Sequence, residues 1–176
     1  GEIQLAHWLF TMPGTSISLG TANIFKFNGN EDSVFLHQGS SFSFGTLILD
    51  KFNNSLLLSG SGGPVNVNAN LTINSGSSLT LNDLNLSVEG VITNNGSLDL
   101  PSGILRGHET FVPGSSSTLN LTGGSLILDH EYTGAMTGLT GTVNFSDGLL
   151  EVTNNGVLIG SAANFQMSGG TLRLGW

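Results

Sequence analysis

The sequence has no cysteine and only four basic residues, and each shortage excludes a class of protein. Without cysteine, neither disulfide bonds nor thiolate metal sites can form. Lys26, Lys51, Arg106 and Arg173 stand against twelve carboxylates, which gives a formal net charge of −8. Nucleic acids and anionic membrane surfaces are held by clustered lysine and arginine, so neither is an expected partner.

Long hydrophobic runs and catalytic signatures are also absent. No apolar run approaches the length that crosses a membrane, and no charged-then-apolar leader opens the sequence, so membrane insertion by this segment is not expected. Neither a Gly-x-Ser-x-Gly nucleophile turn nor a glycine- and aspartate-rich calcium repeat is present. From these residues we expect no cofactor.

One short pattern returns five times between Leu79 and Leu174. Each row consists of two pairs of mostly apolar residues, and the two members of a pair are separated by one residue. A turn connects the first pair to the second, and the spacing of the four positions is the same in every row. Successive rows begin 19 to 24 residues apart, so the length varies only after the second pair. This is typical of a solenoid, which pushes insertions into one loop. The rows are Leu79, Leu81, Leu86, Val88; Leu98, Leu100, Leu105, Gly107; Leu119, Leu121, Leu126, Leu128; Val143, Phe145, Leu150, Val152; and Phe165, Met167, Leu172, Leu174.

The residues inside the pairs test this interpretation. In a strand, alternate side chains point to opposite faces, so these residues should face water. The first column is polar throughout, and the second has one apolar member, Ile127. Glu151 and Arg173 are neighbours in the second column, which predicts a surface ion pair. The columns are Thr80, Asp99, Asn120, Asn144, Gln166, and Ser87, Arg106, Ile127, Glu151, Arg173.

We therefore predict an all-β fold, a right-handed parallel β-helix of about 7–8 coils with roughly 19–24 residues each. A third strand in each coil is indicated by Val91-Ile92, Phe111-Val112 and Val157-x-Ile159. Glycine, asparagine and proline between the strands predict turns, among them Thr122-Gly123-Gly124 and Ser146-Asp147-Gly148.

The N-terminal part of the chain is less regular. Residues 1–16 fit either a short amphipathic helix that caps the solenoid or an ordinary first coil, and residues 17–176 are expected to form one solenoid domain. Phenylalanine is concentrated between Ile17 and Leu49, which suggests a wider or differently shaped core there. Because the last row ends at Trp176 without a capping element, we expect the array to continue in a longer parent protein.

One cluster of titratable residues follows from the repeat. The offsets between rows place Glu89 beside His108 and Glu109, and these beside Asp129, His130 and Glu131. Two imidazoles and four carboxylates on one face are a candidate divalent-metal site or acid–base site. The alternative is that these variable loops splay apart and leave the groups solvated.

The segments Thr118–Leu128 and Asn164–Leu174 carry the pattern Leu-x-Leu or Phe-x-Met, then Gly-Gly, then Leu-x-Leu. Over about the last hundred residues the chain resembles the passenger repeats of bacterial autotransporters and the related haemagglutinin-type adhesins. The resemblance implies a secreted or surface-exposed rod at an extracellular location. No translocator barrel or secretion-domain motif accompanies the repeats.

Two functions follow as hypotheses. The first is a structural or adhesive rod that self-associates end to end or side by side to form filaments, or that presents hydrogen-bonding columns to cell-surface glycans. The second is a polysaccharide lyase or hydrolase, because parallel β-helices also carry such enzymes. Arg106 near His108 and Glu109 would serve the second, but four basic residues leave little to bind an acidic sugar, which favours the non-enzymatic hypothesis.

Overall fold

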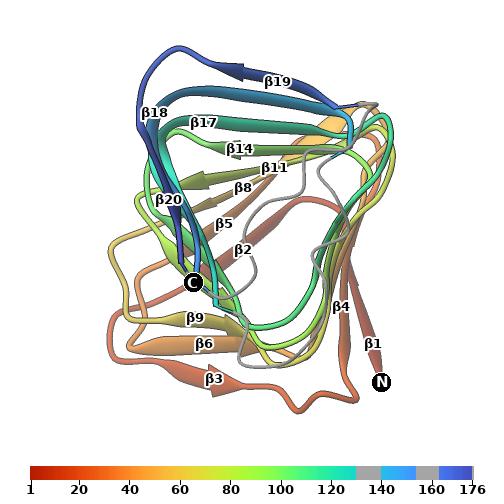
Figure 1. Ribbon diagram of the computed structural model, residues 1–176. Helices are drawn as coiled ribbons and strands as arrows, with labels where there is room; N and C mark the ends of the chain where they lie inside the picture. Colours follow the sequence, from red (N-terminus) through yellow and green to blue (C-terminus); the bar gives the residue numbers. More distant parts are fainter. Residues whose placement is uncertain (130–139, 154–162, 176) are drawn as a thin grey trace.

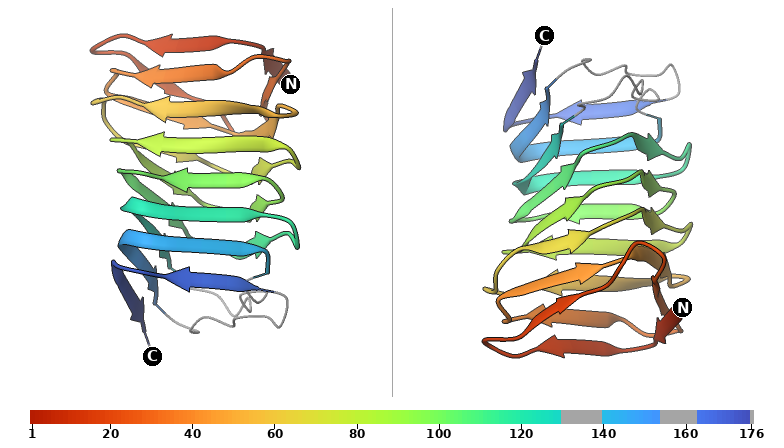
Figure 2. Two further views of the ribbon diagram at one scale, coloured as in Figure 1. Left: turned by 90° about the horizontal axis from the view of Figure 1, so that it is seen from above. Right: turned by 90° about the horizontal axis from the view of Figure 1, so that it is seen from below.

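A computed structural model describes residues 1–129, 140–153 and 163–175, and these residues contain strands and no helix. The chain winds as a right-handed parallel β-helix of about seven coils, and its described strands lie on three flat faces (Figures 1 and 2). The predicted fold class is confirmed. Each face is built from strands that pair in parallel with the same face of the coils before and after.

The first face is a six-stranded sheet in the part of the chain that the structure describes, and β16 is its last described strand. Its strands are short, and the later ones contain only three residues, which matches the weak Val91-Ile92 and Phe111-Val112 signals. The predicted strand at Val157-x-Ile159 lies outside the described residues. The strands are β1 (Glu2–Leu5), β4 (Ile24–Asn28), β7 (Thr46–Asp50), β10 (Leu71–Ile73), β13 (Ile92–Asn94) and β16 (Phe111–Pro113).

The second face carries the first apolar pair of every row. The register places equal row members side by side, for example Leu79 on Leu98 and Leu98 on Leu119. The strands that lie wholly in this face are β2 (Trp8–Thr11), β5 (Ser33–His37), β8 (Asn54–Ser59), β11 (Ser77–Asn82), β14 (Ser97–Leu100) and β19 (Asn164–Met167).

The third face carries the second apolar pair. In the later coils it is continuous with the second face, because β17 (Thr118–Leu128) and β18 (Thr142–Val152) run through the corner as single 11-residue strands. The turns predicted at residues 122–124 and 146–148 are therefore wrong: the chain bends there within a strand, where the pairing register shifts. The remaining strands are β3 (Ser16–Ser18), β6 (Ser41–Phe44), β9 (Val65–Val67), β12 (Asn85–Val88), β15 (Ile104–Gly107) and β20 (Thr171–Leu174).

The core is the column of row residues inside the coils. All members of the first four rows are buried, and Gly107 fits because Ile92 and Leu128 fill the space where its side chain would be. Phe165 and Leu172 in the last row are half-buried, while Met167 and Leu174 are exposed. The predicted alternation of inward and outward side chains is confirmed.

Residues 1–16 form strands. β1 pairs with β4 and β2 pairs with β5, so this segment is the first coil and not an amphipathic helix. The 3/4 spacing of Trp8 and its neighbours does not mark a helix face. Leu9 points inward, while Trp8 and Phe10 lie on the outer side of β2 with 64% and 53% of their surface exposed.

A cluster of phenylalanines fills the core of the second coil. Phe44 has no exposed surface, and its ring centroid lies 4.6 Å from that of Phe42, 5.2 Å from that of Phe25 and 5.4 Å from that of Phe35. Most of these pairs are edge-to-face or tilted, the arrangement that aromatic quadrupoles favour. The concentration of phenylalanine in the sequence corresponds to this cluster.

Lys51 is buried at the corner between the first and second faces. Its Nζ donates to the carbonyl oxygens of Ala6 at 3.1 Å and Asn28 at 3.0 Å, and its backbone N–H donates to Ser77 Oγ at 2.8 Å. These bonds link four successive coils. Burial lowers the pKa of Lys51, and the negative charges of Asp32 and Glu31 partly oppose that effect.

His37 is also buried, among the phenylalanines. Its Nδ1 lies 2.7 Å from Thr11 Oγ1, and its Nε2 has no hydrogen-bond partner among the described residues. The loop after β8 covers the ring, and a methyl group on Gly62 would lie only 2.7 Å from Nε2, so glycine is needed there. Burial lowers the pKa of His37, and the imidazole is therefore neutral at neutral pH.

We predict that His37 makes the fold sensitive to acid. Below about pH 6.5, the ordinary pKa of histidine, the unfolded chain takes up a proton at this position while the folded chain does not. The free energy of unfolding therefore decreases as the pH is lowered from about 6.5 to the lowered pKa of the folded chain. In His37→Asn, urea midpoints measured at a series of pH values should depend less on pH in this range. An unchanged pH dependence would contradict the assignment.

Candidate functional site

The predicted titratable cluster lies at the end of the third-face strands β12, β15 and β17. The backbone N–H of His108 donates to Val88 O, and that of Asp129 donates to Gly107 O, so Glu89, His108 and Asp129 occupy the same position in three successive coils. The predicted alignment is confirmed for these three residues. His130 and Glu131 lie outside the described residues.

His108 contacts two partners through one nitrogen. Its Nε2 lies 2.9 Å from Ser87 Oγ and 3.9 Å from Glu89 Oε1, and the His108 side chain is one-third exposed. A hydroxyl beside an imidazole can pass its proton to that ring. In a catalytic triad the carboxylate holds the second ring nitrogen, whereas here Glu89 is near the same nitrogen as the hydroxyl. The arrangement is a serine–histidine contact with a nearby carboxylate and not a triad.

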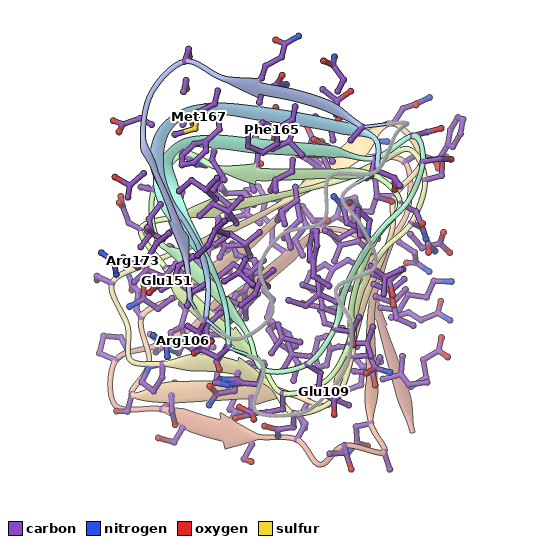
Figure 3. All side chains as sticks on the ribbon, viewed as in Figure 1. Arg106, Glu109, Glu151, Phe165, Met167 and Arg173 are labelled. Atoms are coloured by element: carbon purple, nitrogen blue, oxygen red, sulfur yellow. The ribbon has the colours of Figure 1, made fainter. Side chains whose placement is uncertain are left out.

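Asp129 has a different partner. Its Oδ2 lies 2.7 Å from Arg106 NH1, and Glu109 is exposed and apart from Arg106 (Figure 3). Within the described ranges, no three histidine or acidic residues stand close enough together to hold a metal ion. The structure thus brings His108 to Glu89 and pairs Asp129 with a cation, and a metal site that includes residues 130 and 131 stays a prediction.

All four basic residues are engaged. Lys26 Nζ lies 2.6 Å from Asp50 Oδ2, and this contact holds the pKa of Asp50 below its usual range. Arg173 NH1 lies 3.2 Å from Glu151 Oε1 on the outer surface, which confirms the predicted pair (Figure 3). Lys51 is buried on carbonyl oxygens and Arg106 lies on Asp129, so each of the four basic residues has a partner within the protein.

The polar column of the second face forms a ladder of hydrogen bonds. Asn144 Nδ2 donates to Asn120 Oδ1 at 2.8 Å, Asn120 Nδ2 donates to Asp99 Oδ1, and Ser78 Oγ donates to Asp99 Oδ2 at 2.8 Å. Thr80, Asp99, Asn120 and Asn144 are half-buried and Gln166 is exposed, as the alternation predicts. The sequence predicted that these residues face outward, and it did not predict the bonds between them.

Sequence reasoning missed a polar groove. It follows the corner between the first and second faces, and its lining comes from five successive coils, from Asp32 before β5 to Thr118 at the start of β17. This corner of the coils lies at the upper right of Figure 1. Its volume is about 490 Å³, and a second hollow of about 520 Å³ shares Ser75, Asn95 and Ser116 with it. The groove is lined by Asp32, Asn53, Asn54, Ser55, Ser75, Gly76, Ser77, Ser78, Asn95, Gly96, Ser97, Ser116 and Thr118.

Phe52 stands beside this groove and is 74% exposed. Its Cδ2 lies 3.1 Å from the position that a methyl group on Gly76 would take, so the ring lies next to the glycine of the next coil. Gly76 has a φ of +78°, a conformation that favours glycine. An exposed aromatic ring therefore lies at the edge of a groove of hydroxyl and amide groups.

Comparisons with known proteins add no assignment. No family model, curated protein or solved structure matches the chain. No helix among the described residues is long and apolar enough to span a membrane.

Proposed function

We propose that this chain is a structural and adhesive segment of an extracellular β-helical rod, and that its copies associate end to end. The proposal is supported by the repeats that resemble those of autotransporter passengers and haemagglutinin-type adhesins, and by the β-helical fold. The observation that carries it is the character of the two end coils of this 176-residue chain; where the array continues in a longer parent chain, its next coil takes the place of the second copy. Within the described residues, β1, β2 and β3 each pair on one side only, as do β19 and β20.

The inward rows of these end coils are uncovered. Ile3 and Ile17 are 42% and 40% exposed at one end, and Met167 and Leu174 are 45% and 46% exposed at the other, although their neighbours one coil inward are at most 5% exposed. Unpaired parallel strand edges with bare apolar rows are templates for a further coil of the same kind. A second copy stacked head to tail would continue the second and third faces and bury Ile17, Met167 and Leu174.

A charge placed at either end should block this association. Ile17→Lys and Met167→Lys put an ammonium group into the proposed contact, while Thr72→Lys adds the same charge on the outer side of β10. We expect wild type and Thr72→Lys to increase in mass with concentration in light scattering, and both end variants to stay monomeric. Equal masses for all four chains would contradict the proposal.

The adhesive role rests on the outer surfaces, where the asparagine ladder and the polar groove offer hydrogen bonds along the rod. The enzyme hypothesis is carried only by the contact between Ser87 and His108. Incubation of the chain with neutral and acidic polysaccharides, followed by detection of new reducing ends or unsaturated products, tests that hypothesis.

A further inference from the structure

The groove at the corner between the first and second faces contains polar side chains that make no hydrogen bond to another described residue. Asn53, Ser75, Asn95 and Ser116 line it, and their side chains make no hydrogen bond to any described residue. Together they offer two amides and two hydroxyls, and each of these groups both donates and accepts. They come from four successive coils, so the available groups form a line parallel to the axis of the rod.

The charge of the groove restricts what it can bind. Asp32 is its only ionisable lining residue, and its Oδ1 accepts from the backbone N–H of Ser55 at 2.7 Å and from Ser55 Oγ at 2.9 Å. These bonds, the backbone one first, hold the pKa of Asp32 below its usual range, so it is ionised at neutral pH. With no basic residue in the lining, phosphates and acidic sugars are repelled and not held.

Phe52 supplies the apolar contact that such a ligand would need. Its ring lies next to Gly76, which lines the groove, and 74% of the residue's surface is exposed to solvent. The flat C–H face of a sugar ring packs on an aromatic ring of this kind, while the hydroxyl groups of the sugar reach polar neighbours. The elongated groove crosses several coils, and this shape suits a chain of sugar rings better than a single compact molecule.

We propose that this groove binds a neutral oligosaccharide, laid along the rod axis with one sugar ring on Phe52 and its hydroxyls on Asn53, Ser75, Asn95 and Ser116. The inference deepens the adhesive part of the proposed function and rests on it. It does not require end-to-end association, because every lining residue belongs to the inner coils of a single copy.

The test uses neutral hexasaccharides of glucose, xylose, mannose and N-acetylglucosamine, with oligogalacturonate as the acidic contrast. Binding is measured by saturation-transfer NMR and calorimetry into the millimolar range. At least one neutral probe should bind, and oligogalacturonate should not. Phe52→Ala should weaken binding about tenfold or more, as loss of a central aromatic contact does, while Phe52→Tyr keeps it.

The matched control is Trp8→Ala, which removes an equally exposed aromatic side chain from the outer side of β2. It should leave affinity unchanged. Binding by none of the neutral probes, preference for the acidic probe, or equal losses in Phe52→Ala and Trp8→Ala would overturn the inference. Light scattering on the same samples separates the two proposals, because sugar binding by a chain that stays monomeric rejects end-to-end association and supports the groove.

Discussion

Phe44→Ala is expected to lower the free energy of unfolding by about 3–5 kcal/mol, the cost of removing a fully buried phenylalanine ring. The side chain is enclosed by Phe25, Phe35 and Phe42, whose rings are themselves packed edge to face and cannot all move to fill the void. Urea unfolding followed by circular dichroism measures the loss.

Phe52→Ala is the matched control for this prediction, because it removes the same side chain from a site that is 74% exposed. Its effect on stability should stay within about 0.5 kcal/mol. Similar losses in the two variants would mean that the cluster around Phe44 is not the centre of the core in the early coils.

Lys51→Ala is expected to destabilise the chain by about 2–4 kcal/mol, because it opens a void and removes the Nζ donor from two part-buried carbonyl oxygens, of which that of Ala6 keeps only Ser33 Oγ at 2.9 Å. The carbonyls belong to Ala6 and Asn28, so the damage should be greatest in the first two coils. Hydrogen exchange of the β1 and β2 amides should speed up more than exchange in β11 or β14.

Lys51→Met separates the two contributions to that loss. It keeps the length and volume of the stem and removes only the donor, so a loss of about 1–3 kcal/mol should remain. If Lys51→Met is as stable as wild type, the bonds to the two carbonyls give no net stability and the prediction fails. That result would agree with the general cost of burying a charge.

The repeated part of the fold was predictable from sequence because the same spacing of apolar residues recurs in every coil and determines which strands pair. Leu79, Leu98 and Leu119 recur at the same place in each row, and the register pairs them directly. The sequence prediction was wrong at single corners of the coils. Thr122-Gly123-Gly124 has the composition of a turn, but β17 bends there and stays paired with β18 through a shift in register.

The missed features depend on neighbours that sequence does not reveal. Lys51 looks like a surface residue, and only the carbonyls of two earlier coils make its burial possible. The groove is assembled from residues of five coils whose connecting loops differ in length, so no regular spacing marks it. Of the titratable cluster, the repeat predicted the alignment of Glu89, His108 and Asp129, but not that Arg106 would engage Asp129.

End-to-end association is tested most directly by electron microscopy of the purified wild-type chain over a concentration series, with light scattering alongside. End-to-end association of β-helical coils predicts rods of constant width whose length grows with concentration. Ile17→Lys should give only single short rods under the same conditions. Wild-type particles that keep the size and mass of one chain at every concentration would contradict the proposed association.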